Sequence, residues 1–243
     1  MISKTMVVGL VLVSGLSLGA VPAFAAPPGR APSAANQENR ISNLQNRANE
    51  AIENRITRLN QLIDKINDIK RLTSDQKSTL TGQIQSEVSA LETLKTKIDA
   101  DTDLTTLRAD VQSIVKSYRV YVVFIPKVYI VAHADRLMDV VGLLQTYESK
   151  LQTRVTAAGS PSALTALLSD MTAKLTDANT QAQNAINAVL PLTPDGWPGN
   201  KATLQSARTM LQTARQDIQT AWHDAQQIRQ GLPKPSVTPK DTH

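Results

Sequence analysis

Cysteine is missing from all 243 residues, and aromatic residues make up only 3% of them. The absence of thiols excludes disulfides, zinc-thiolate sites and cysteine nucleophiles. The fold must therefore be held together by burial of apolar side chains alone, which a chain of about 200 residues can achieve. Basic clusters with interleaved aromatics are also missing, so the sequence predicts no nucleic-acid partner.

Recognisable catalytic signatures are lacking as well. Beyond residue 25 the chain shows no nucleophile motif, P-loop, dinucleotide fingerprint or zinc-protease helix. The Glu-x-x-His motif with which helical bundles hold paired metal ions is absent too. We therefore expect no enzymatic activity and no cofactor.

The first 25 residues are typical of a secretory signal peptide. Lys4 supplies the positive charge, an apolar run follows over 6–20, and Ala23-Phe24-Ala25 places small residues at the cleavage positions. The alternative, an uncleaved membrane anchor, is disfavoured because the run is short of the roughly 20 residues needed to span a bilayer. We expect Sec-type export, cleavage near Ala25, and a secreted or periplasmic protein.

The remaining chain divides by composition. Residues 26–36 are rich in proline and small residues and are expected to form a flexible leader. Residues 37–230 are expected to form a single helical-bundle domain, and 231–243, with three prolines, a disordered tail. The formal charge of +5 is spread along the helices with both signs mixed, which is typical of a solvated surface.

Apolar residues recur every three or four positions throughout the predicted domain. The spacing predicts a first helix over about 37–71, and a second from a capping box at Thr73-Ser74-Asp75-Gln76 to about 98. A third is predicted over about 104–158. The next begins with Ser160 as N-cap and Pro161 as its first residue, and the last covers about 200–230. The fold class is all-α: an elongated antiparallel bundle of four to five long helices. Seven-residue repeats favour coiled-coil-like packing.

Pro126 lies inside the third predicted helix. It removes a backbone donor and crowds the carbonyl of Val122, so we expect a kink or break between about Val122 and Arg136. The surrounding run, Val120 to Val131, is rich in β-branched and aromatic residues, and a strand or hairpin is the alternative there. Heptad continuity with both flanks favours a helix.

The segment from Tyr118 to Ala132 concentrates the scarce aromatics: Tyr118, Tyr121, Phe124 and Tyr129. One interpretation is a central helix buried on most of its circumference. The other is a partner-binding or membrane-contacting element, loosely similar to the segment that helical pore-forming toxins hide in a soluble bundle. The segment is too short to span a bilayer as a helix and contains Lys127, so membrane contact is the less favoured of these.

Alternating carboxylates at Asp99, Asp101 and Asp103 resemble the start of a calcium-binding EF-hand loop. The pattern departs from that loop at Leu104, where a glycine is needed, and at Asp110, where a glutamate is needed. The alternative is helix capping by Thr102 or Asp103.

Leu72-Thr73-Ser74-Asp75-Gln76 resembles the LTxxQ motif of the small helical periplasmic chaperones related to Spy and CpxP. The resemblance implies an exported helical protein that binds unfolded clients without ATP. It covers five residues, and the second copy of the motif that is usual in that family is absent. The capping box explains the same residues.

These patterns lead to three functional hypotheses. The first is an exported, non-enzymatic structural or interaction protein of the bacterial envelope or exterior, which binds a protein, an envelope polymer or itself. The second is an ATP-independent chaperone or adaptor, and the third is a membrane-active helical toxin. His133 is expected to be a partly buried helix residue without a metal.

Overall fold

The computed structural model describes residues 34–116 and 118–233. The predicted signal peptide (1–25), most of the leader and residues 234–243 of the predicted tail lie outside the described residues. The elements are α1 (Ala34–Asp68), α2 (Ser74–Ala100), α3 (Leu104–Lys116), the π-helical turn η1 (Val120–Phe124), α4 (Ile125–Ala157), α5 (Ser162–Val189), the 3₁₀ turn η2 (Pro194–Gly196) and α6 (Asn200–Gly231). No strand occurs among these residues, so the helical expectation is confirmed, including for 120–131.

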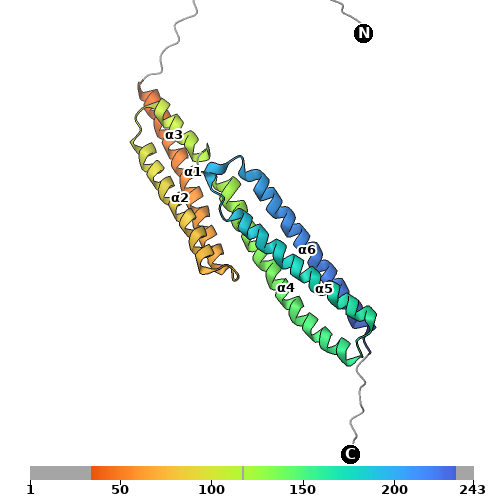
Figure 1. The fold of residues 1–243 in the computed structure, drawn as a ribbon. Coiled ribbons are helices and arrows are strands. Elements are labelled where there is room, and N and C mark those ends of the chain that lie inside the picture. Colours follow the sequence, from red (N-terminus) through yellow and green to blue (C-terminus); the bar gives the residue numbers. More distant parts are fainter. Residues whose placement is uncertain (1–33, 117, 234–243) are drawn as a thin grey trace, which may run out of the picture.

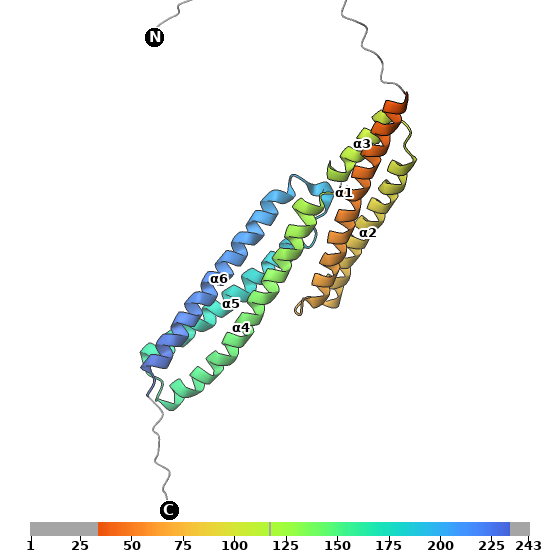
Figure 2. The same cartoon turned by 180° about the vertical axis from the view of Figure 1, so that it is seen from behind.

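The helices form two groups of three, placed end to end with a lateral overlap (Figures 1 and 2). α1, α2 and α3 pack together, as do α4, α5 and α6, and α1 also contacts α4. The buried apolar side chains of both groups join in one hydrophobic cluster. In the second group α4 and α6 run in the same direction, and α5 runs back between their ends (Figure 1). None of the described helices is both long and apolar enough to cross a bilayer.

Two predicted helix starts can be compared with the structure. Thr73 accepts from the Gln76 amide and the Gln76 side chain accepts from the Thr73 amide, which confirms the capping box. Ser160 is not the N-cap of α5, because it adopts a positive φ of 53° directly after Gly159 at 84°. These two residues end α4 in a left-handed turn, and the cap position passes to Pro161.

The interruption of the third predicted helix lies earlier than Pro126. The chain breaks before Arg119, which adopts a left-handed conformation, and resumes as a π-helical turn in which the Ile125 amide donates to the Val120 carbonyl. Pro126 then stands in the first turn of α4, where its missing donor costs little. The expected kink at Pro126 is not confirmed, because the wider π-helical turn ahead of the proline leaves room for its ring.

Lys127 is the most deeply buried charged residue among those described, with none of its surface exposed. Its ammonium donates to Gln83 Oε1 of α2 at 2.5 Å and to the carbonyls of Leu190 and Leu192 at 2.6 and 3.0 Å. Leu190 is the C-cap of α5, an end where backbone carbonyls favour a cation. Each of the three donors is therefore used, and one side chain links α2, α4 and the end of α5.

A second link joins the turn between α1 and α2 to α4. The Arg71 amide donates to Asp135 Oδ1 at 2.7 Å, and Arg71 Nε donates to Asp139 Oδ1 at 3.0 Å. A Cβ at Gly142 would approach the Arg71 guanidinium to 3.0 Å, so the glycine leaves room for this contact. Together the two links set how the helix groups lie against each other.

We expect substitution Lys127→Met to change how stability depends on pH. Burial lowers the pKa of Lys127 to about 8, from an ordinary value of 10.5. The unfolded chain therefore holds more protons than the folded one between these values, and the wild type gains stability as pH rises through that window. Urea unfolding at pH 7.5 and pH 10.5 should show the difference between wild type and Lys127→Met shifting in favour of wild type. A constant difference would contradict the burial of a charged ammonium.

Glu87, one turn beyond Gln83 on α2, should make stability depend on pH in the opposite direction from Lys127. Burial, and then the charge of Asp195, raise the pKa of Glu87 to about 7 from 4.5. Its Oε1 atom is buried and accepts no hydrogen bond from the described residues. The wild type thus loses stability as pH rises from 4.5 to about 7. Glu87→Gln should equal wild type at pH 4 and exceed it at pH 8 in thermal unfolding; a variant less stable at pH 8 would refute this.

Candidate binding groove between α4 and α6

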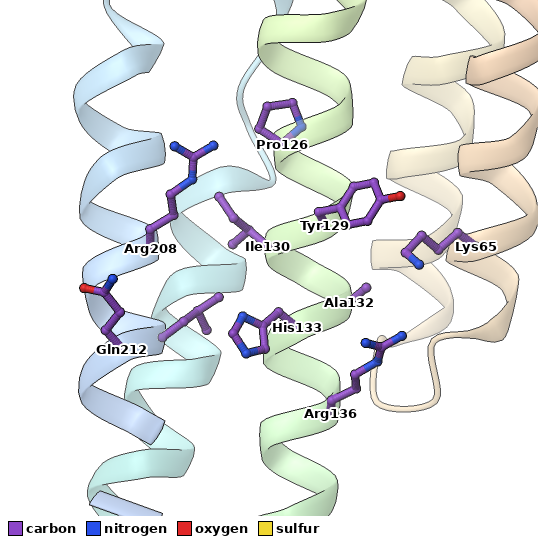
Figure 3. Close-up of a pocket in the computed structure, with 10 residues that line it drawn as sticks. Lys65, Pro126, Tyr129, Ile130, Ala132, His133, Arg136, Arg208 and Gln212 are labelled. Atoms are coloured by element: carbon purple, nitrogen blue, oxygen red, sulfur yellow. The ribbon is translucent and has the colours of Figure 1, made fainter. Parts of the chain in front are cut away.

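A groove with a volume of about 540 Å³ lies between α4 and α6, with α1 at its edge. Its floor is apolar, formed by Ile130 of α4 and Leu211 of α6, with Pro126 at one end, and Ala132 lines it on the side of α4 towards Lys65. Figure 3 shows His133 between α4 and α6 and Lys65 on the far side of Tyr129, on α1. The walls are polar or charged, so the groove offers an apolar base with a cationic rim.

A second hollow of about 290 Å³ continues the groove towards the start of α6. It shares Pro126 and Arg208 with the first and adds Trp197 and Lys201 from the loop before α6 and its first turn. Tyr121 and Val122 of η1 line its other side. The two hollows together follow the line where α4 and α6 lie side by side.

Positive charge dominates both hollows. The described residues that line them include the cations Lys65, Arg136, Lys201 and Arg208 and no carboxylate. Lys65 Nζ lies 4.8 Å from the ring centre of Tyr129, a cation–π contact that orients this ring at the rim. Arg136 and Arg208 are exposed, and neither forms an ion pair with a described residue. The groove can therefore receive an anionic group beside an apolar one.

The pKa of His133 reflects the positive charge around it. Partial burial, and then the guanidinium groups of Arg136 and Arg215, hold its pKa below the ordinary value. His133 is a helix residue, as expected, and its side chain is exposed at the groove with only part of its surface covered. The imidazole is thus neutral over more of the physiological range than a free histidine, and offers hydrogen bonds rather than a further charge.

The four aromatics singled out in the sequence divide between core and groove. Phe124 is buried, and Tyr118 is half-buried with its hydroxyl donating to the Ala90 carbonyl at 3.0 Å. Tyr121 and Tyr129 are exposed, 47% and 57%, and line the two hollows. Arg55 of α1 lies 5.1 Å from the Tyr121 ring. The segment is therefore a largely buried helix with two of its tyrosines at a surface groove.

The three acidic residues of the loop before α3 do not converge. Asp103 caps α3 by accepting from the amides of Thr105 and Thr106, which confirms the capping alternative and lowers its pKa. Asp99 accepts from Asn49 at 2.6 Å and pairs with Lys95, while Asp101 is placed beside Asp110. No group of three histidine or acidic side chains suited to a metal ion occurs in the part of the chain described. The calcium site stays a prediction without geometric support.

The residues resembling the chaperone motif lie at the turn between α1 and α2. Leu72 is buried in the core, and Thr73 and Gln76 are occupied with each other in the capping box. None of these side chains lines the groove. The motif therefore has a local structural explanation here.

Sequence reasoning missed the residues that form the groove. Arg136, Arg208 and Lys65 belong to three different helices, and nothing in the local sequence of any one of them indicates that they share a groove. The sequence offers one usable signal: the segment from Tyr118 to Ala132 contains more apolar residues than the burial of one helix face requires. Comparison with known proteins finds no matching family model, no matching curated protein and no matching solved structure.

The pKa of His133 offers a direct check on the groove's charge. Arg136→Gln removes the groove cation that most disfavours the imidazolium, so the pKa of His133 should rise. An NMR titration of the His133 ring protons measures it. The same exchange at Arg108, an exposed residue of α3, is the control and should leave the pKa unchanged. An unchanged pKa in Arg136→Gln would show that the groove does not have the proposed positive field.

Proposed function

We propose that this protein is an exported, non-enzymatic interaction protein that binds an anionic partner in the groove between α4 and α6. The observation that carries the proposal is the composition of that groove: among the residues described, four cations and no carboxylate surround an apolar floor. Apolar burial supplies affinity at such a site, and the surrounding charge selects the partner and speeds its approach.

The proposed export rests on the residues before Ala25, and the absence of catalysis on the missing sequence signatures. Envelope polymers and exposed acidic proteins are the anionic partners that such a location offers. The seven-residue rows agree with the proposed coiled-coil-like packing, because Leu204, Leu211, Ile218 and Ala225 of α6 are all buried. A bundle of this kind has a stable core, so its surface can be specialised for binding.

The test uses poly-L-glutamate as an acidic probe. The double variant Arg136→Glu/Arg208→Glu reverses two groove charges at exposed positions and should leave the fold intact. Its matched control is Arg40→Glu/Arg108→Glu, which makes the same change in net charge at exposed positions of α1 and α3 outside both hollows. Binding is measured by fluorescence anisotropy at low ionic strength.

The groove variant should bind poly-L-glutamate about tenfold more weakly than wild type, equivalent to about 1.4 kcal/mol. The control variant should lose much less. Equal losses in the two variants would mean that only net charge matters, and the proposed groove would be wrong. Absence of binding by wild type would remove the proposal altogether.

A further inference from the structure

The first half of α4 touches solvent along one narrow stripe. Between Ile125 and Leu143 its exposed positions are 129, 133, 136, 140 and 143, and every other residue in this span is buried or half-buried. Steps of four and three residues keep these positions on one face. Three of the five side chains, Tyr129, Val140 and Leu143, are large and apolar, and Leu143 is 72% exposed.

This stripe has the spacing of a coiled-coil seam. Val122, Tyr129, Arg136 and Leu143 recur every seven residues, and so do Pro126, His133, Val140 and Tyr147. The side of α4 that packs against α5 and α6 uses other residues, among them the buried Leu137, Leu144 and Leu151. α4 therefore carries a second apolar seam that no described helix covers along its length.

A matching stripe runs along α6. The exposed positions that form the α6 stripe follow the same four-and-three spacing as those of α4: the polar residues Lys201, Gln205, Arg208, Gln212, Arg215 and Gln219, and then Trp222. Three of these seven residues are cationic and none is acidic.

Contacts at three levels show that the two stripes adjoin. Near the start of the helices, the residues of both stripes line the two hollows. In the middle, Arg215 of α6 acts on the pKa of His133 of α4. Further on, the rings of Tyr147 and Trp222 lie 6.2 Å apart. Because α4 and α6 run in the same direction, these contacts keep their order along the whole seam (Figure 2).

We infer that the seam between the α4 and α6 stripes receives one amphipathic α-helix of a partner protein, with an apolar face on the α4 stripe and acidic residues along the α6 stripe. The inference rests on the proposed function and names its partner class. A helix anchors through residues three and four apart, which is the spacing of both stripes. From Val122 to Tyr147 the seam is about 38 Å long, enough for roughly seven helical turns.

Charge and shape favour this occupant over two others. A second copy of this chain would place the same cations of its own α6 stripe against these, and the pairing would be repulsive. A bilayer surface is flat, whereas the floor of the groove is recessed: Ile130 and Leu211 are 4% and 2% exposed. A protruding helix reaches this floor.

The probes are two 28-residue peptides of identical composition, each with leucine and glutamate as the main residues. One places leucine at heptad positions a and d and glutamate at e and g; the other is scrambled so that no apolar face forms. The test variant is Val140→Gln/Leu143→Gln, which removes the exposed apolar side chains and leaves the cations in place. The control is Val115→Gln, an equally apolar residue of α3 that is 57% exposed. Fluorescence anisotropy gives each Kd.

The amphipathic peptide should bind at least tenfold more tightly than the scrambled one, and the test variant should weaken it at least fivefold while the control does not. Binding of poly-L-glutamate should be the same in the test variant as in wild type. If poly-L-glutamate binds but the two peptides bind equally, the helix inference fails and the proposed function stands; if no acidic probe binds, both fail. If vesicles of anionic phospholipid bind and the test variant abolishes this, the seam is a membrane-contacting surface and the inference is overturned.

Discussion

The position of α4 depends on one buried ammonium group. Lys127 has no exposed surface, and its three donors reach Gln83 of α2 and the carbonyls of Leu190 and Leu192 beyond α5. A buried cation costs free energy unless every donor is used, so the three acceptors cannot move apart independently. The lysine thereby fixes the start of α4 against α2 of the first helix group, and Arg71 of the turn between α1 and α2 fixes its middle through Asp135 and Asp139.

The same constraint explains why a functional surface lies on α4. Helices packed on three sides are normally apolar around most of their circumference. α4 is buried by α5 and α6 and, over part of its length, by α1. The contacts with α1 close one side, and a single stripe beside α6 stays open. Apolar side chains on that stripe contribute nothing to the core, and the cations opposite them on α6 are left without acidic partners among the described residues that line the groove.

The helical periodicity of the sequence correctly predicted the all-α class and the long helices, because a buried face demands apolar residues three and four apart. Local residue types predicted the cap at Thr73, and of the two caps offered for the acidic loop, Thr102 or Asp103, the structure uses Asp103; both side chains accept from amides within three residues. The sequence misplaced the interruption before α4, which lies at Arg119 and the π-helical turn after it and not at Pro126. A proline can be absorbed by a wider turn ahead of it, and periodicity does not distinguish that turn from a kink. Ser160 is predicted as the cap because serine is a preferred N-cap ahead of a proline in the first helical position, and its residue type does not indicate the left-handed conformation that it adopts after Gly159.

The groove could not be predicted, since residues that lie far apart in the chain, on three different helices, come together to line it. Lys65, Arg136 and Arg208 each look like ordinary surface charges until α1, α4 and α6 are placed together. In the sequence alone, Lys127 stands out only as a charge that argues against membrane insertion. Its acceptors are two backbone carbonyls and a distant glutamine, and no sequence pattern encodes such partners.

The arrangement of the two helix groups is the central claim, and the cysteine-free chain allows it to be measured by spin labels at introduced cysteines. Labels at Ser86→Cys and Asn184→Cys would occupy exposed positions of α2 and α5, the two helices whose residues Gln83 and Leu190 accept from Lys127. Double electron–electron resonance should give one narrow distribution of the distance between the two labels in an otherwise wild-type chain, and a clearly broader one when Lys127→Met is added. A distribution already broad with Lys127 present, or one equally narrow without it, would contradict the account.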